Sequence, residues 1–115
     1  MIGVPTLLLR TTGRRSGATR TNALVYARDG NDYVVVASNG GADRPPAWLY
    51  NVQAKPDVEI QVGREPEKAS ARVLEPPDPE YERLWRTVNE NNRDRYTAYQ
   101  QKTSRPIPII AITPN

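Results

Sequence analysis

The stretch TNALVYARDGNDYVVVA, residues 21–37, decides the fold, because it reads as two strands joined by a tight turn. Its first part, Thr21 to Arg28, alternates in side-chain character, as expected of a strand with two different faces. The residues Asp29-Gly30-Asn31-Asp32 are typical of a turn, and Tyr33 to Ala37 is an apolar run that returns as the partner strand. The segment therefore predicts an antiparallel hairpin in a mainly β protein.

Segments on either side of this hairpin predict four more strands. An apolar run over 5–11 precedes it, and alternation predicts strands over 58–62 and 69–74. A last strand is expected over 107–112. Pro106 and Pro108 place at least the start of this strand at a sheet edge, because proline cannot donate a hydrogen bond to the neighbouring strand.

Two or three short helices complete the prediction. The pair Pro45-Pro46 can begin a helix over 47–54, since a proline in the first turn loses no needed hydrogen bond. Asp78 is the expected N-cap of a second helix, whose apolar residues from Tyr81 to Val88 follow at helical spacing. A polar helix is expected over about 93–102. Six mostly antiparallel strands with such helices predict an α+β, mainly β, small barrel.

The composition limits the chemistry that this chain can perform unaided. Its 115 residues suit one domain, 1–115, and a hydrophobic fraction of 37% without Phe suits a modest core. Because Cys and His are both absent, Cys–His and Ser–His–Asp nucleophiles, zinc sites with those ligands and His-ligated haem are excluded. No metal site is expected, and demanding chemistry must come from a bound organic cofactor.

The charge balance and the hydropathy pattern suggest the kind of partner. A net charge of +3 is mild, and it suits an acidic small ligand at one patch better than a nucleic-acid surface. No apolar run approaches the roughly 20 residues of a membrane helix, and the N-terminus lacks the pattern of a signal peptide. A cytoplasmic protein with no integral membrane segment is expected.

The loop TTGRRSGATR, residues 11–20, contains the most suggestive cluster of polar residues. Its free backbone amides and Arg14, Arg15 and Arg20 can hold a phosphate or carboxylate through charge-assisted hydrogen bonds. The spacing matches neither a Walker loop nor a Rossmann turn. A solvated connection between strands is the alternative, and the loop by itself slightly favours it.

A second polar loop favours the ligand-binding interpretation. Residues Ser38 to Gly41 follow the returning strand of the hairpin, and a helix is expected to begin at Ala47. In a meander, consecutive strands lie side by side. The loop from Ser38 to Gly41, the start of the helix at Ala47 and the start of the strand at Thr21 would then meet at one cleft. Two glycine-bearing loops and a helix N-terminus would then line the same groove.

Three segments of the chain resemble the deazaflavin-dependent nitroreductase family. They are LLRTTGRRSGATRTNALVY (8–26), VVVASNGGADRPPAWLYNVQAKPDVEIQV (34–62) and RPIPIIAIT (105–113). The resemblance covers almost the whole chain, from about Pro5. It implies a split β-barrel, related to flavin-reductase-like barrels, that binds coenzyme F420.

The resemblance also implies a set of site residues. Residues facing the coenzyme's phosphate and oligoglutamate tail would be Arg14, Arg15 and Ser16. Residues beside the deazaflavin and its ribityl chain would be Arg20, Thr21, Asn22, Ala23, Leu24, Val25, Val36, Ala37, Ser38 and Asn39, with Ala47, Trp48, Leu49, Tyr50 and Asn51 opposite. Tyr96 would contact the coenzyme and Tyr99 would line the substrate pocket. Ser38, Tyr96 and Tyr99 are the expected catalytic residues, as hydrogen-bond or proton donors.

The function implied is hydride transfer from reduced F420 to a quinone, enone or nitro compound. A family nitroreductase has a tyrosine where this chain has Val25 and a lysine where it has Asn39. Quinones and enones are therefore expected ahead of nitro compounds. The alternatives are a non-catalytic F420 carrier and an FMN-binding barrel. A nucleic-acid-binding barrel is disfavoured by the few aromatics among the basic residues, and a homodimer is possible.

Overall fold

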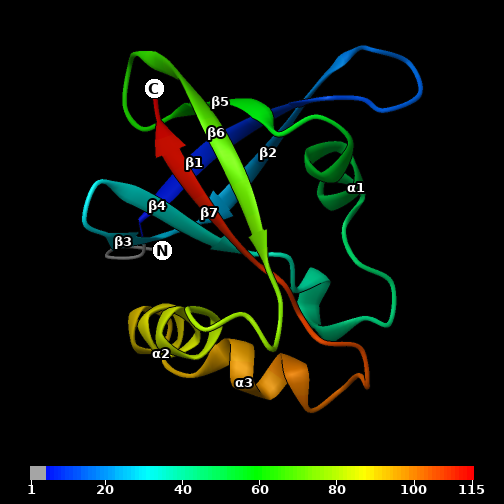
Figure 1. Ribbon diagram of the computed structural model, residues 1–115, viewed down its shortest axis with the longest axis vertical. Coiled ribbons are helices and arrows are strands. Elements are labelled where there is room, and N and C mark those ends of the chain that lie inside the picture. Colours follow the sequence, from blue (N-terminus) through cyan, green and yellow to red (C-terminus); the bar gives the residue numbers. More distant parts are fainter. Residues whose placement is uncertain (1–4) are drawn as a thin grey trace.

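The computed structural model describes residues 5–115, which form a curled sheet of seven strands with helices against it (Figure 1). The strands are β1 (Thr6–Thr12), β2 (Thr19–Val25), β3 (Ala27–Asp29), β4 (Asp32–Val36), β5 (Asp57–Gln61), β6 (Pro66–Leu74) and β7 (Ile109–Pro114). The helices are α1 (Ala47–Ala54), α2 (Tyr81–Asn91), α3 (Arg95–Gln100) and a short 3-10 helix, η1 (Asn39–Gly41).

The strand order shows why the sheet closes on itself. Neighbouring strands are antiparallel in the order β2-β1-β5-β6-β7-β4-β3. The edge strands β2 and β3 are separated in sequence only by Tyr26. In a flat sheet, strands spaced by about 4.8 Å would place the two edges about 29 Å apart, far beyond the reach of one residue. The sheet must curl until its edges meet at Tyr26, and the predicted mainly β split barrel is confirmed.

The predicted hairpin is correct at its turn but wrong in its length. Ala27–Asp29 pair with Asp32, Tyr33 and Val34, and Gly30 has the positive φ of +60° that a tight turn between them needs. Thr19–Val25 pair instead with β1. Because the chain bends at Tyr26, the one predicted strand becomes two, and the sheet has seven strands rather than about six.

The predicted edge position of the last strand is also wrong. Strand β7 lies between β6 and β4, inside the sheet. It begins at Ile109, so both Pro106 and Pro108 precede the ladder and remove no hydrogen bond from it. The carbonyl of Pro108 even accepts the amide of Ala37 at 3.0 Å.

The helices follow the prediction with shifted ends. Helix α2 begins at Tyr81, and its N-cap is Glu80 rather than Asp78. The Asp78 carboxylate still accepts the Glu80 amide, at 2.9 Å, in the turn that leads into the helix. Helix α3 is shorter than predicted, because Arg93 and Asp94 have positive φ angles of 54° and 59° that interrupt the helical path. None of the helices within residues 5–115 is long and apolar enough to cross a membrane.

Alternation along the strands produces a core on each face of the sheet. On the concave side, Val35 and residues of β1, β5, β6 and β7 pack against Trp48, Leu49 and Val52 of α1. On the convex side, Val34 and Val36 pack under α2 and α3, which lie side by side below the sheet in Figure 1. The concave side is therefore covered by α1, and of the two grooves described next, one opens beside α1 and the other lies between the start of α1 and α3.

Candidate functional site

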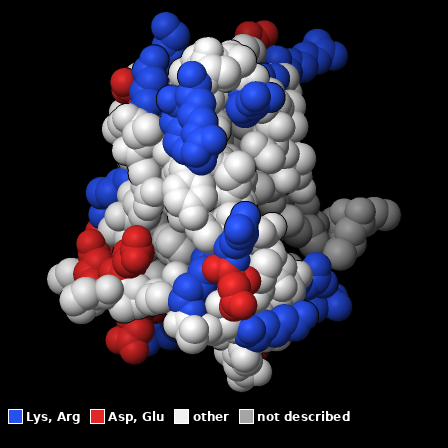
Figure 2. Space-filling view, turned by 90° about the vertical axis from the view of Figure 1, so that its right-hand side faces the viewer, with Lys and Arg blue, Asp and Glu red and all other residues white. Residues whose placement is uncertain are grey.

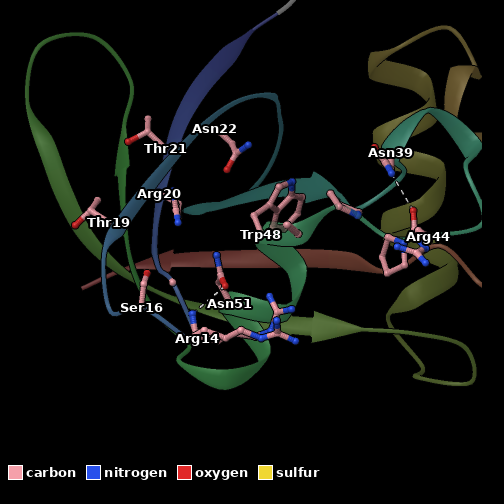
Figure 3. Close-up of a pocket in the computed structure, with 15 residues that line it drawn as sticks. Arg14, Ser16, Thr19, Arg20, Thr21, Asn22, Asn39, Arg44, Trp48 and Asn51 are labelled. Atoms are coloured by element: carbon pink, nitrogen blue, oxygen red, sulfur yellow. Dashed lines mark hydrogen bonds between the residues drawn. The ribbon is translucent and has the colours of Figure 1, made fainter.

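The larger groove, of about 920 Å³, lies between the β1–β2 loop, η1 and the start of α1. We call it the arginine groove. Its lining residues are Gly13, Arg14, Arg15, Ser16, Thr19, Arg20, Thr21, Asn22, Asn39, Arg44, Pro45, Pro46, Ala47, Trp48 and Asn51. In Figure 3, Ser16 and Thr19 lie toward one end and Asn39 and Arg44 toward the other, with Trp48 between them.

The arginine groove is cationic. Four arginines line it, and the described lining residues include no Asp or Glu. Figure 2 views this side of the molecule and shows Lys and Arg side chains above and below an uncharged band, with Asp and Glu side chains beside the lower ones. Guanidinium groups that face a groove without neighbouring carboxylates are matched to a ligand with several negative charges.

The β1–β2 loop is held in a compact turn by its own hydrogen bonds. The Gly13 amide donates to the carbonyl of Ala18 at 2.7 Å, and the Gly17 amide donates to the carbonyl of Gly13 at 2.8 Å. The Ser16 hydroxyl accepts the Ala18 amide at 3.1 Å. A Cβ at Gly13 would lie 2.8 Å from the Ser16 hydroxyl, so this position needs glycine unless the serine moves.

Helix α1 fixes the same loop to the core. Asn51 accepts the Arg14 backbone amide through Oδ1 at 3.1 Å and donates through Nδ2 to the Thr11 hydroxyl at 3.2 Å. Asn51 and Thr11 are only 5% and 2% exposed, so this link is shielded from water. The Arg14 guanidinium carbon lies 4.9 Å from the centre of the Tyr50 ring, a cation–π distance. Both ends of Arg14 are thus placed by neighbouring residues of one helix.

A second groove, of about 390 Å³, continues from the first. We call it the tyrosine groove. The two share Asn22, Asn39, Pro46 and Trp48, so Trp48, 4% exposed, forms part of the wall of both. The other residues lining the tyrosine groove are Ala23, Leu24, Val25, Val36, Ser38, Gly40, Asn92, Arg95, Tyr96 and Tyr99.

Hydroxyl groups gather in the tyrosine groove. Ser38 is the N-cap residue of η1, yet its side chain makes no capping hydrogen bond. The rings of Tyr96 and Tyr99 meet edge to face, with centroids 6.2 Å apart. Burial raises the pKa of Tyr96, and the interaction with Tyr99 adds to the rise, while a hydrogen bond with Asn92 and the charge of Arg95 oppose it. Tyr96 therefore keeps its proton at neutral pH and can donate it in a hydrogen bond.

Most of the predicted site residues lie in these two grooves. The arginine groove contains Arg14, Arg15, Ser16, Arg20, Thr21, Asn22, Asn39, Ala47, Trp48 and Asn51. The tyrosine groove adds Ala23, Leu24, Val25, Val36, Ser38, Tyr96 and Tyr99.

Three predicted site residues line neither groove. Ala37 is fully buried and Leu49 is buried in the concave core. Tyr50 is 40% exposed and lies against Arg14. Alternation explains these positions, because residues adjacent in a strand or helix face in different directions.

Sequence reasoning missed several groove residues. Gly13, Thr19, Arg44 and Pro45 line the arginine groove, and Gly40, Asn92 and Arg95 line the tyrosine groove; Pro46 lines both. Arg44 carried a usable signal, since it ends the same polar loop as Ser38. Asn92, at the end of α2, and Arg95, in α3, carried none, because only the packing of the chain around the α2–α3 turn brings them to the groove.

Comparison with known proteins gives a consistent result. The family model "F420H(2)-dependent quinone reductase" matches residues 1–114. A protein of Mycobacterium tuberculosis (strain ATCC 25618 / H37Rv), named F420H(2)-dependent quinone reductase, is 53% identical over 109 residues, which are 95% of this chain and 73% of that protein. A solved structure described as an F420-H2 dependent reductase is 36% identical, with a TM-score of 0.81, and the match covers 94% of this chain and 93% of that one. Another, described as a domain-swapped dimer, is also 36% identical, with a TM-score of 0.82, covering 94% of this chain and 79% of that one.

Proposed function

Because this chain belongs to the F420H(2)-dependent quinone reductase family, we propose that it transfers a hydride from reduced coenzyme F420 to a quinone. The observation that carries the proposal is the continuity of the two grooves at Trp48. A cationic groove for an anionic chain leads directly into a smaller groove lined by hydroxyl groups. In a molecule that has a polyanionic tail and a redox-active ring, the tail would match the cationic groove and the ring would match the smaller groove.

The residues present fit the proposed coenzyme. Arg14, Arg15 and Ser16 would hold its phosphate and oligoglutamate tail, because these residues line the groove from a loop held by its own hydrogen bonds. The side chain of Trp48 supplies a rigid aromatic wall where the grooves meet. With Asn22 on β2 and Asn39 on η1 beside it, this junction would position the ring.

When bound, reduced F420 would supply the hydride, and the protein would supply orientation and hydrogen bonds. Ser38, Tyr96 and Tyr99 surround the tyrosine groove with groups that can donate to an oxygen that gains negative charge as a quinone is reduced. Tyr96 is suited to that role because its raised pKa keeps the hydroxyl protonated. Apolar Val25 and Val36 line the same groove and would limit the access of water.

The lining of the tyrosine groove supports the order of acceptors expected from the sequence. Val25 gives this wall an apolar surface without a hydroxyl, which suits the ring of a quinone or the carbon skeleton of an enone more than a nitro group, whose two oxygens would use a further donor. Anaerobic assays of reduced F420 with a quinone, an enone and a nitroaromatic compound test this order. Turnover with the quinone supports the proposal, whereas silence with all three favours a non-catalytic F420 carrier.

Three broader features belong to the same proposal. We treat 1–115 as one coenzyme-binding domain, supported by the single continuous sheet. A homodimer is supported by the 36% identical relative described as a domain-swapped dimer, and light scattering of the purified protein tests it. The cytoplasmic location expected from the sequence stays a prediction.

A further inference from the structure

Arg105 lies outside both grooves but is bonded to the loop that carries Ser38. Its Nε donates to the carbonyl of Ala42 at 2.9 Å and its Nη2 to the carbonyl of Ser38 at 2.9 Å. Weaker bonds from both Nη atoms reach the carbonyl of Ala37 at 3.4 Å. One planar guanidinium thus bridges the two ends of the turn that contains η1.

The position of the Arg105 backbone is itself fixed by α3. The side chain of Gln100, the last residue of α3, donates to the Arg105 carbonyl at 2.7 Å and accepts the Ile107 amide at 3.0 Å. The segment between α3 and β7 is therefore held to the end of the helix. Movement of the Arg105 backbone relative to α3 would break these bonds.

Two further contacts join the same pair of segments. The Thr103 hydroxyl donates to the Asp43 carboxylate at 2.7 Å. Gly41 lies so close to α3 that a Cβ built on it would be 2.7 Å from the carbonyl oxygen of Tyr99, and its φ is +85°. The loop that contains Ser38 is thus packed and bonded against the segment that contains Tyr99.

We propose that Arg105 is a positioning residue that sets the place of Ser38 relative to Tyr96 and Tyr99 in the tyrosine groove. Ser38 comes from the end of β4 and the tyrosines come from α3, so no single element fixes the distance between them. Arg105 links the two elements, because its backbone carbonyl is bonded to Gln100 of α3 and its guanidinium donates to the Ser38 carbonyl. This inference rests on the proposed function for its catalytic consequence, but the structural link can be measured without the coenzyme.

The first test is hydrogen exchange in the protein without coenzyme. The Gly41 amide donates to the Ser38 carbonyl at 2.9 Å and the Ala42 amide to the Asn39 carbonyl at 3.2 Å, so both amides report on the loop. In Arg105→Ala these two amides should exchange at least several-fold faster, while the Ile110 amide inside β7 stays protected. Unchanged exchange at Gly41 and Ala42 would overturn the proposal, whether or not the protein reduces quinones.

The second test is a double-mutant cycle with Ser38. Arg105→Ala should lower kcat on the order of tenfold and change the Kd for F420 less than kcat, since the β1–β2 loop with Arg14 and Arg15 is untouched. In the Ser38→Ala background the same change should have little further effect on kcat. An equal loss of kcat in both backgrounds would mean that Arg105 does not act through Ser38.

Two further variants distinguish the loss of the Arg105 hydrogen bonds from a general folding defect. Arg105→Lys keeps the charge, but its ammonium cannot bridge the Ala42 and Ser38 carbonyls as the planar fork does, so it should behave like Arg105→Ala. It replaces Arg105→Ala in both tests if that variant does not fold. Arg64→Ala removes one charge from the exposed β5–β6 turn and should change neither exchange at Gly41 nor kcat.

Discussion

The backbone amide of Arg14 donates a hydrogen bond of 3.1 Å to the side chain of Asn51, which is 37 residues further along the chain. Asn51 is buried in α1, and α1 is packed into the concave core of the barrel. The cationic loop is therefore anchored to the buried core of the barrel. Loop order of this kind lowers the entropy that would be lost on binding a flexible anionic chain.

Removal of the Asn51 side chain should weaken both the fold and coenzyme binding. Asn51→Ala leaves the Thr11 hydroxyl and the Arg14 amide without their partner, so the free energy of unfolding should fall by about 1–3 kcal/mol. The Kd for F420 should rise because the loop is released. Urea denaturation and fluorescence titration measure the two effects, and Gln53→Ala on the exposed side of α1 is the control. A lower stability with an unchanged Kd would separate Asn51 from binding.

Loss of the two loop arginines should weaken coenzyme binding without altering the fold. Arg14→Ala combined with Arg15→Ala should raise the Kd for F420 by about tenfold to a hundredfold, equivalent to about 1.4–2.8 kcal/mol. Added salt should shrink the difference from wild type, because screening weakens the lost interactions. Fluorescence titration at two salt concentrations measures both results.

The matched control removes two arginines elsewhere. Arg64→Ala combined with Arg86→Ala changes the net charge equally, and both residues are exposed and outside the arginine groove. Its Kd should stay near that of wild type. If both double variants weaken binding to the same extent, general attraction by the positive protein accounts for the effect and the loop has no special role.

The hydroxyl of Tyr96 should act as a donor throughout the neutral pH range. Burial raises its pKa, so the group stays protonated well past neutrality. Tyr96→Phe should lower kcat on the order of tenfold, and the ratio of wild-type to variant kcat should be constant from about pH 6 to pH 9. A ratio that falls toward one above about pH 8 would show that the hydroxyl loses its proton there, contrary to this assignment.

The Tyr81 hydroxyl should make the free energy of unfolding fall as the pH rises through the alkaline range. It donates to the Ile107 carbonyl, and burial raises its pKa from 10.0 to about 12, with the charge of Glu75 contributing. A pKa raised in the folded state means that the folded protein holds the proton more tightly. The stabilisation is complete below pH 10 and is lost as the pH rises toward 12.

Tyr81→Phe tests this linkage. The variant should be less stable than wild type at pH 8, because the Ile107 carbonyl loses its donor. The difference should shrink between about pH 10 and pH 12, since only the wild type has this group to titrate. Urea denaturation at a series of pH values measures the difference, and a gap that widens with pH would contradict the assigned direction of the shift.

Local signals in the sequence predicted the parts of the fold that depend on local geometry. Gly30 marks a tight turn, and Trp48 follows a proline pair that begins a helix, so both features could be found in short windows. The pairing of β2 with β1 instead of β4 depends on the bend at Tyr26, and no residue pattern encodes that bend. The curl of the sheet therefore became visible only in the strand order.

The candidate site was predicted unevenly for the same reason. Charge and glycine content indicated the loop around Arg14, because the arginines and glycines of this loop are close together in the sequence. Arg105 was missed, since its partners are carbonyls of Ser38 and Ala42, 67 and 63 residues earlier in the chain. Carbonyl acceptors are present at every position and leave no signature in a sequence.

In the proposed complex, the arginine groove accepts the polyanionic tail of F420 while the tyrosine groove accepts its ring. Fluorescence titration of the purified protein with F420 and with FMN, at low and at moderate salt, tests it most directly. We predict saturable binding of F420 that weakens as salt is added, and much weaker binding of FMN, which has one phosphate and no tail. Tighter binding of FMN, or F420 binding that is indifferent to salt, would contradict the account.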